Sequence, residues 1–393
     1  MSMQRFIIEG GKKLSGSVRI SGAKNSALPI IAASLLTDKK VVLENVPDVS
    51  DVRTMIELCT HLGASVEFDR NVLKIHTPVI TSIEAPYDIV RKMRASYYVL
   101  GALLGRENKA HVSLPGGCAI GPRPVDLHIK GLKALGADIQ IDGGFINGRV
   151  GRLVGQDVNL QGPKGTSIGA TINTMLAAVL ADGKTTITPA ACEPEVLDVA
   201  DFLNALGFDV SGHGTHTITI KGETCTNGVH YQIIPDRIEA GTFAVAAAIT
   251  RSKIALTHCA PNHLSSVLDA LSEIGVSIHR GEHEITVDGK QSFKPTNIFV
   301  AAYPGFPTDM QAQFMALLSI VAGTSTIKET IFENRFMQAL EMMRMGADIT
   351  IEGDTAVIHG VERLSGTTVM ASDLRASASL VLAGLVAKGK TTI

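Results

Sequence analysis

The sequence contains no tryptophan, and aromatic residues make up only 4% of its 393 residues. Because hydrophobic residues still amount to 45%, small and aliphatic side chains must fill the cores. An excess of either charge is also missing, since the formal net charge is −2 and both signs are interspersed. This charge pattern argues against nucleic acid or a membrane surface as a partner. An anionic ligand would have to be bound by a local cluster of cations.

Cysteine is scarce as well, with five residues far apart in the chain: Cys59, Cys118, Cys192, Cys225 and Cys259. Their number is odd, and no CxxC pair or metal-finger spacing occurs, which is typical of proteins in a reducing cytosol. Residues 1–6 lack the apolar core of a signal peptide, and the apolar stretches are too short to span a bilayer. We therefore expect a soluble, cytoplasmic protein without a metal site or another cofactor.

A repeat runs through the chain. Glycines preceded by Leu, Ile or Met recur at intervals of 73, 71, 68 and 71 residues, at Gly63, Gly136, Gly207, Gly275 and Gly346. An amphipathic stretch precedes each glycine and an alternating stretch follows it, which predicts a helix, a glycine at its C-terminal end and then a strand. A fixed period of this length indicates one supersecondary unit copied in tandem.

A second pattern, an apolar helix followed by a polar turn and a strand, occurs six times. Its copies span residues 27–43, 97–114, 170–188, 243–257, 311–328 and 376–393. Each repeat should contain this pattern and one glycine motif. Because the pattern occurs six times and the glycine motif only five times, we expect that the sequence lacks the final strand, helix and hairpin of a sixth repeat. The apolar helices should be buried, whereas the helices of the glycine motifs carry charges on one face and should lie outside.

These patterns predict an α/β protein of two domains, each an inside-out α/β barrel in which sheets surround buried helices. Six βαβαββ-type repeats, the last one truncated, divide into two sets of three. The first domain is expected at 22–229, and the second at 1–21 together with 230–393, with a crossing near the loop 222–228. The strand-like residues 6–8 are expected to pair with the last strand and close the second domain.

A polar residue stands at the entrance of each predicted buried helix, about fourteen residues before the turn that ends it. The six positions are Lys24, Arg94, Ser167, Arg237, Asp309 and Arg375. A helix N-terminus carries free N–H groups and partial positive charge, so it attracts anions. Three such ends from each domain are expected to face one cleft that binds phosphate and carboxylate groups. For any single position, an ordinary cap or a solvated charge is the alternative.

The segment 115–124 is the most unusual in the chain, because its three glycines and three prolines exclude a helix or a central strand. Cys118 lies in this loop, and Arg123 follows five residues later. A nearby guanidinium favours the thiolate and makes a cysteine reactive. Glycine hinges also indicate a lid that closes over a ligand. The other four cysteines have no such setting and are expected to be structural.

Five motifs, at 21–29, 115–128, 307–314, 332–336 and 373–379, give the chain a resemblance to a known family. Over essentially its whole length it resembles the bacterial UDP-N-acetylglucosamine enolpyruvyl transferases. The resemblance implies two inside-out α/β domains of three repeats each. It also implies transfer of the enolpyruvyl group of phosphoenolpyruvate to the 3′-hydroxyl of UDP-N-acetylglucosamine, with release of phosphate, in the first committed step of peptidoglycan synthesis.

The same resemblance implies roles for individual residues. Cys118 would protonate the methylene carbon of phosphoenolpyruvate and would be the target of fosfomycin, and Asp309 would be the base, with Lys24 and Arg375 also catalytic. The residues implied for phosphoenolpyruvate binding are Lys24, Asn25, Arg123, Arg335 and Arg375. Those implied for the nucleotide sugar are Arg94, Arg123, Pro124, Val125, Asp126, Leu127, Ser167, Gly169, Asp309 and Ile331. Around Lys164 the basic residue is displaced by one position from some family members.

Two other functions stay open. The sister transferase that acts on shikimate 3-phosphate has the same six-repeat fold, but it lacks a loop of the kind that holds Cys118. A paralogue or truncated chain that binds the nucleotide sugar without turnover is the second alternative, because the family's final segment carries a further phosphate-binding arginine. The sequence does not indicate whether the protein is a monomer or an oligomer.

Overall fold

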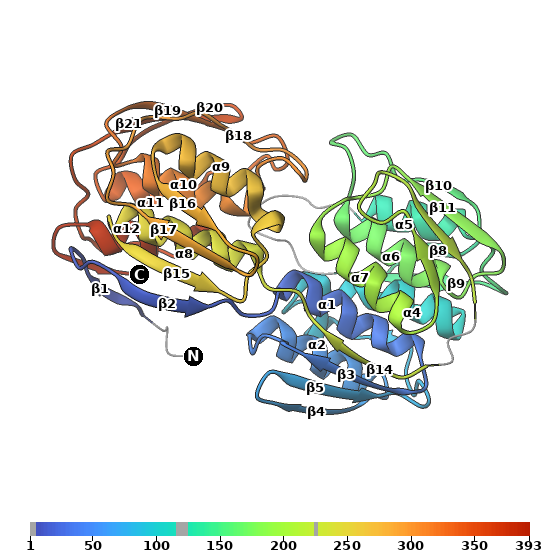
Figure 1. The fold of residues 1–393 in the computed structure, drawn as a ribbon. Coiled ribbons are helices and arrows are strands. Elements are labelled where there is room, and N and C mark those ends of the chain that lie inside the picture. Colours follow the sequence, from blue (N-terminus) through green and yellow to red (C-terminus); the bar gives the residue numbers. More distant parts are fainter. Residues whose placement is uncertain (1–4, 115–124, 224–226) are drawn as a thin grey trace. The chain divides into compact units, whose positions relative to one another are not determined.

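The computed structural model describes residues 5–114, 125–223 and 227–393. These residues form two compact units, which Figure 1 shows as ribbons. The first unit lies within residues 21–235, and the second comprises residues 5–20 and 236–393. The chain thus leaves the second unit after Ile20 and returns to it after Pro235.

Three helices form the interior of the first unit: α1 (Lys24–Ala33), α4 (Tyr98–Glu107) and α6 (Ile168–Ala178). Most of their residues are buried, which confirms the prediction from their uniformly apolar sequences. Helix α4 packs against both α1 and α6. Its contact with α6 is so close that a Cβ on Gly101 would lie 2.2 Å from the carbonyl oxygen of Asn173, so only glycine fits there.

The second unit has the same design, with α8 (Arg237–Ile249), α10 (Gln311–Leu318) and α12 (Leu374–Val386) in its interior. Each of these three helices contacts the other two. Their buried residues belong to one hydrophobic core, which is separate from the core of the first unit. Each unit therefore has its own core built around a trio of helices.

In the described ranges, five four-stranded sheets and one two-stranded sheet cover these helices. In the first unit the strand orders are β14 (Val229–Gln232), β3 (Lys40–Glu44), β5 (Val72–His76), β4 (Ser65–Asp69); β6 (Glu84–Ala85), β7 (Lys109–Ser113), β9 (Phe145–Arg149), β8 (Asp138–Asp142); and β10 (Asp157–Asn159), β11 (Lys184–Thr188), β13 (Ile218–Lys221), β12 (Asp209–Ser211). In the second unit they are β16 (Ser277–Arg280), β17 (Glu284–Asp288), β15 (Lys253–Thr257), β2 (Ser15–Arg19); β18 (Ile298–Phe299), β19 (Gly323–Lys328), β21 (Thr355–Gly360), β20 (Asp348–Glu352); and β1 (Ile7–Glu9), β22 (Lys390–Thr392). Figure 1 shows the sheets that contain β15 and β19 on either side of α8, α10 and α12.

Each four-stranded sheet contains one parallel pair and two antiparallel pairs of strands. In three sheets a buried helix lies between the two parallel strands in the sequence: α4 between β6 and β7, α6 between β10 and β11, and α10 between β18 and β19. Parallel strands need such a crossover, because a tight turn cannot join them. Each of these three helices is therefore part of the crossover that joins two neighbouring strands of one sheet.

The helices of the glycine motifs are α2 (Ser50–His61), α5 (Asp126–Ala134), α7 (Pro194–Ala205), α9 (Ser265–Ile274) and α11 (Met337–Arg344). All five glycines follow their helix with φ between +91° and +116°, the left-handed conformation that ends a helix, so the predicted pattern is confirmed. The expectation that all five helices lie outside is wrong for α7. Its polar residues Glu195 and Asp198 are buried, because α7 packs against α1, α6 and β14.

The remaining helical segments are short: α3 (Tyr87–Val90) and the 3₁₀ turns η1 (Ser34–Leu36), η2 (Arg94–Tyr97), η3 (Pro261–Leu264) and η4 (Thr308–Met310). Within the described ranges, no helix is both long enough and apolar enough to cross a membrane. The same residues contain no group of three or more His, Cys, Asp or Glu side chains placed to hold a metal ion.

Each chain crossing follows a strand that pairs within the unit that the chain is leaving. Before the first crossing, β2 pairs in parallel with β15, and before the second, β14 pairs in parallel with β3. The second crossing was expected near 222–228, with a boundary after residue 229; because β14 completes a sheet of the first unit, the chain crosses only after Pro235. Strand β1 pairs antiparallel with β22, Ile7 opposite Thr392, which confirms the pairing expected for residues 6–8.

Candidate functional site

The six polar residues of the helix entrances all lie at or next to the N-terminal end of a buried helix. In chain order, Lys24 begins α1, Arg94 begins η2 just before α4, Ser167 caps α6, Arg237 begins α8, Asp309 lies in η4 just before α10, and Arg375 is the second residue of α12. The predicted position of these six residues at helix starts is therefore confirmed. The convergence of all six ends on one cleft stays a prediction.

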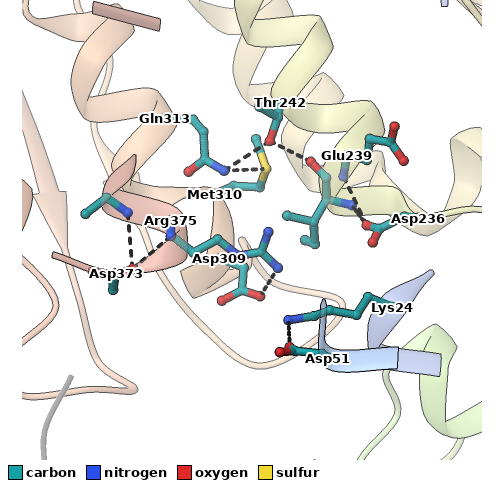
Figure 2. A network of polar contacts seen from close by, with 12 residues as sticks. Lys24, Asp51, Asp236, Glu239, Thr242, Asp309, Met310, Gln313, Asp373 and Arg375 are labelled. Carbon is teal, nitrogen blue, oxygen red and sulfur yellow. Dashed lines mark hydrogen bonds and ion pairs between the residues drawn. The ribbon is translucent and has the colours of Figure 1, made fainter. Parts of the chain in front are cut away.

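The densest charge cluster lies in the second unit around Asp309. Its Oδ1 accepts a hydrogen bond from Nη2 of Arg335 at 2.8 Å, and its Oδ2 accepts one from Nη2 of Arg375 at 2.7 Å. The exposed fractions are 27% for the Asp309 side chain, 4% for Arg335 and 18% for Arg375. Figure 2 shows the Asp309 carboxylate and the Arg375 guanidinium facing each other. Three charged side chains thus share a mostly buried space with a net positive charge.

The electrostatics of this cluster follow from burial and from the two ion pairs. Burial alone would raise the pKa of Asp309, but the charges of Arg375 and Arg335, with a smaller contribution from Arg237, hold it below its usual range. For Arg375, burial would lower the pKa, but the Asp309 carboxylate more than offsets this and raises it. The cluster is therefore fully ionised at neutral pH, and Asp309 is a weak base while both guanidinium groups contact it.

Helix caps hold the two arginines that follow them in sequence. Asp373 caps α12 by accepting hydrogen bonds from the backbone N–H groups of Arg375 at 2.8 Å and Ala376 at 3.2 Å. Asp236 caps α8 in the same way, with the backbone N–H groups of Ile238 at 2.8 Å and Glu239 at 3.0 Å. Such a cap stabilises a helix by about 1 kcal/mol. Each cap also fixes the first turn from which the arginine side chain extends.

In the first unit, Lys24 forms an ion pair with Asp51 of α2, with 2.9 Å between Nζ and Oδ2. Figure 2 shows this pair as well. The next residue, Asn25, is exposed, whereas Ser26 is fully buried. The first turn of α1 therefore directs Asn25 to solvent and anchors itself through Ser26.

Asp198 of α7 is the anchor for Ser26, and sequence reasoning missed it. The Ser26 hydroxyl donates to Oδ2 of Asp198, the Tyr231 hydroxyl donates to Oδ1 at 2.6 Å, and the backbone N–H of Ile234 donates to Oδ2 at 3.4 Å. Asp198 is 2% exposed, and this burial raises its pKa to about 6 despite the hydrogen bonds, which lower it. Asp198 thereby joins α1, α7 and β14. Its charge on an amphipathic helix gave no signal, because such charges usually face solvent.

A buried histidine, His128 of α5, is the second residue that the sequence did not single out. Asn173 accepts a hydrogen bond from the Gly101 N–H at 2.6 Å through Oδ1, so its Nδ2 donates to the Tyr97 carbonyl at 2.9 Å and to Nδ1 of His128 at 3.1 Å. His128 therefore carries its proton on Nε2. Burial, and then the charge of Arg94, lower the pKa of His128 to about 4, so the ring is neutral at physiological pH.

The start of α6 lies against this histidine. The Ser167 hydroxyl caps the helix by accepting from the Ala170 N–H at 3.2 Å. A Cβ on Gly169 would lie 3.0 Å from Nε2 of His128, so glycine is needed for the close approach. Of the residues implied for the nucleotide sugar, Ser167 and Gly169 thus lie at the start of α6 beside His128. The charge of Arg94 acts on the same histidine. Val125, Asp126 and Leu127 lie at the N-terminal end of α5, which also carries His128.

Other expected residues lie elsewhere. Ile331 is half-buried in the loop after β19, the same loop that carries Arg335. Lys164 is exposed in the turn before α6. Cys118, Arg123 and Pro124 lie outside the described residues, as does the whole segment 115–124.

Three of the cysteines expected to be structural are free and buried: Cys59, Cys192 and Cys259. Burial raises the pKa of Cys59 to about 12 and that of Cys259 to about 11, and it also raises the pKa of Cys192. These thiols are therefore poor nucleophiles, which confirms the structural interpretation. Cys225 lies outside the described residues.

Comparison with protein families gives one match over nearly the whole chain. Residues 8–393 match the family model described as EPSP synthase (3-phosphoshikimate 1-carboxyvinyltransferase). Among solved structures, the enolpyruvyl transferase NikO from Streptomyces tendae is similar with a TM-score of 0.88 and 26% identity, covering 98% of this chain and 92% of that one. An EPSP synthase from Acinetobacter baumannii shares the fold, with a TM-score of 0.75 and 21% identity over 100% of this chain and 94% of that one.

Curated relatives are considerably more similar in sequence. A UDP-N-acetylglucosamine 1-carboxyvinyltransferase of Desulfosudis oleivorans is 52% identical over 391 residues, which cover 100% of this chain and 93% of the relative. Proteins of the same name from Caldanaerobacter subterraneus and Coxiella burnetii are each 51% identical, covering 99% and 100% of this chain and 93% and 90% of the relatives.

Proposed function

The chain belongs to the EPSP synthase family of enolpyruvyl transferases, and we propose that it is an enzyme that transfers the enolpyruvyl group of phosphoenolpyruvate to the 3′-hydroxyl of UDP-N-acetylglucosamine, with release of phosphate. The observation that carries the choice of acceptor is the identity of about half of all positions to relatives of that name, spread over 100% of this chain. The Asp309 cluster supports the choice of donor, because phosphoenolpyruvate carries a phosphate and a carboxylate that need buried cations. As part of the same proposal, the enzyme works in the cytoplasm at the first committed step of peptidoglycan synthesis.

The chemistry is an addition followed by an elimination. A proton added to the methylene carbon makes the neighbouring carbon cation-like, and the sugar oxygen attacks that carbon and loses its own proton. The tetrahedral ketal then loses phosphate and one methyl proton, which restores the double bond. We assign the first proton to Cys118, whose unperturbed thiol pKa of roughly 8.5 suits a donor near neutral pH. The same thiol would open the epoxide of fosfomycin.

Asp309 is the proposed base for the sugar hydroxyl, and its present partners set a condition on that role. While Arg335 and Arg375 contact it at 2.8 and 2.7 Å, its pKa is too low for effective proton abstraction. The phosphate and carboxylate of phosphoenolpyruvate would engage the same guanidinium groups. The positive charges of Arg335 and Arg375 would then stabilise the Asp309 carboxylate less, and the pKa of Asp309 would rise. Asp309 would therefore become a better base only when phosphoenolpyruvate is bound.

The other proposed roles follow from charge and position. Lys24, Asn25 and Arg123 would complete the phosphoenolpyruvate site, with Lys24 leaving Asp51 for the substrate. For the nucleotide sugar, we propose binding at the helix starts of Arg94 and Ser167. Further contacts would come from Arg123, Pro124, Val125, Asp126, Leu127, Gly169, Asp309 and Ile331. Preorganised charge of this kind is usually the largest catalytic contribution, and removal of one donor costs about 3 kcal/mol.

Phosphate release separates this proposal from its two rivals. The purified protein should release phosphate from phosphoenolpyruvate with UDP-N-acetylglucosamine and not with shikimate 3-phosphate, and fosfomycin should abolish the release. Cys118→Ala should lower the rate by at least about 100-fold because it removes the acid, whereas Cys118→Asp should retain part of it because a carboxylic acid can still donate a proton. Activity with shikimate 3-phosphate would support the sister enzyme. Binding of the nucleotide sugar without phosphate release would identify a non-catalytic paralogue.

A further inference from the structure

A buried carboxylate behind the Asp309 cluster has no assigned role. Glu329 directly follows β19 and is 3% exposed. Its Oε2 accepts a hydrogen bond from the Thr308 hydroxyl at 2.7 Å. Its Oε1 accepts from the backbone N–H groups of Ile331 at 2.8 Å and Phe332 at 3.1 Å. In the part of the chain that the structure describes, no ion pair involves Glu329, so three neutral donors compensate its carboxylate.

The donors to Glu329 come from the two segments that carry the Asp309 cluster. Thr308 immediately precedes Asp309 in η4. Ile331 and Phe332 begin the loop that leads to Arg335, and the Phe332 ring lies 5.6 Å from the Arg335 guanidinium. The two segments are therefore joined twice, by the Asp309–Arg335 ion pair at one end and by Glu329 at the other. A closed ring of side-chain contacts results.

Glu329 itself is firmly placed, which it must be in order to fix other groups. Its backbone N–H donates to the Asp354 carbonyl at 2.8 Å, in the turn between β20 and β21. The next residue, Thr330, donates its hydroxyl to the Val300 carbonyl at 2.7 Å. The carboxylate thus extends from the rigid end of a sheet, and rigid elements hold functional groups more accurately than loops do.

We propose that Glu329 is a positioning residue of this enzyme, which fixes the base Asp309 and the anion-binding Arg335 relative to each other by joining Thr308 to the backbone at 331–332. It does not touch the reacting atoms. This inference rests on the proposed function, because it assigns a role around residues that we place in the reaction. The physical reason is that a displacement of about 1 Å in a catalytic group lowers the rate by about 100-fold.

The Thr308 hydroxyl offers the sharpest test, because one substitution removes its hydrogen-bond donor and another keeps it. Thr308→Val keeps the shape and removes the donor, while Thr308→Ser keeps the donor and removes a methyl group. In the full-length protein, Thr308→Val should lower kcat by about 10- to 100-fold, and Thr308→Ser should stay within about threefold of the wild type. Glu329→Ala combined with Thr308→Val should be no slower than Glu329→Ala alone, because the alanine has already removed the acceptor for the Thr308 hydroxyl. Glu352→Gln, on the exposed face of β20, is the control.

Two readouts distinguish positioning from a general loss of stability. Amide hydrogen exchange at Ile331 and Phe332 should speed up in Glu329→Ala at pH and temperature where exchange in the buried helices is unchanged. The acidic limb of the kcat profile should move to higher pH in Thr308→Val, because the Arg335 charge would lie farther from Asp309.

Equal kcat values for Thr308→Val and Thr308→Ser would overturn the inference, as would additive effects of Glu329→Ala and Thr308→Val. Either result could be obtained only with an active wild-type enzyme. An inactive wild type with intact folding would instead contradict the proposed function.

Discussion

At the scale of single residues, the Asp309 cluster shows one carboxylate shared by two guanidinium groups. Arg335 is 4% exposed, and a guanidinium buried to that degree needs an anionic partner. Asp309 supplies that partner, and it would compete with any anion that binds the same guanidinium groups. In the proposed reaction the same carboxylate removes a proton from the sugar hydroxyl.

Asp309→Asn should therefore have opposite effects on turnover and on anion binding. Phosphate release should fall by at least about 100-fold, because an amide cannot accept the sugar proton. Phosphoenolpyruvate should bind about tenfold more tightly, because both guanidinium groups lose their internal anion. Titration calorimetry with phosphoenolpyruvate on the wild type and the variant measures this, and Asp348→Asn, on an exposed strand, is the control. Unchanged or weaker binding would contradict the competition.

Sequence reasoning at this scale found charges but not their partners. Helix periodicity predicted that Asp309, Arg375 and Lys24 stand at helix starts, because the turn that ends each buried helix can be counted back. The contacts of Asp309 with Arg335, and of Lys24 with Asp51, join residues distant in the chain, and no local pattern encodes them. Glu329 and Asp198 were missed for the same reason, since a carboxylate on its own carries no sign of burial.

At the scale of elements, α7 is the helix that departs from the expected pattern. Its glycine motif and its ending follow the other four helices, but most of its residues are buried, Glu195 and Asp198 among them. The buried position of α7 costs free energy at Asp198, because burial disfavours the charged form of a carboxylate. Hydrogen bonds from Ser26, Tyr231 and Ile234 offset only part of that cost, which is why its pKa is raised to about 6.

The free energy of unfolding should depend on pH through the titration of Asp198. A folded-state pKa of about 6, above the unfolded value, means that the contribution of Asp198 to stability is fully present below the unfolded pKa and is lost as pH rises through 6. Between pH 5 and pH 7, the wild type should lose about 1 kcal/mol of unfolding free energy relative to Asp198→Asn, whose amide does not titrate. Urea unfolding at both pH values measures the difference, with Asp157→Asn on exposed β10 as control. A difference that stays constant between the two pH values would exclude this role.

At the scale of the whole molecule, the chain builds two similar units and crosses between them after Ile20 and after Pro235. The tandem period predicted six repeats and two sets of three buried helices, because hydrophobic periodicity is local and each copy reports it independently. The exact crossing was not predictable, because β14 is a short strand whose parallel partner, β3, lies far back in the chain. A local pattern identifies such a strand but not the sheet that it joins.

The crossing makes a prediction about where the first unit can be cut. A fragment of residues 21–235 keeps β14, which pairs with β3 over four residues from Val229 to Gln232 and supplies Tyr231 to Asp198. A fragment ending at residue 228 exposes the edge of β3 and leaves the buried Asp198 without the Tyr231 hydroxyl, and an unpaired edge strand promotes aggregation. The longer fragment should therefore unfold cooperatively in urea and remain monomeric, while the shorter one should be less stable by at least about 2 kcal/mol or aggregate. If both fragments unfolded at the same urea concentration, β14 would contribute nothing to the stability of the first unit. The boundary near residue 229 that the sequence predicted would then describe the stable unit better than Pro235 does.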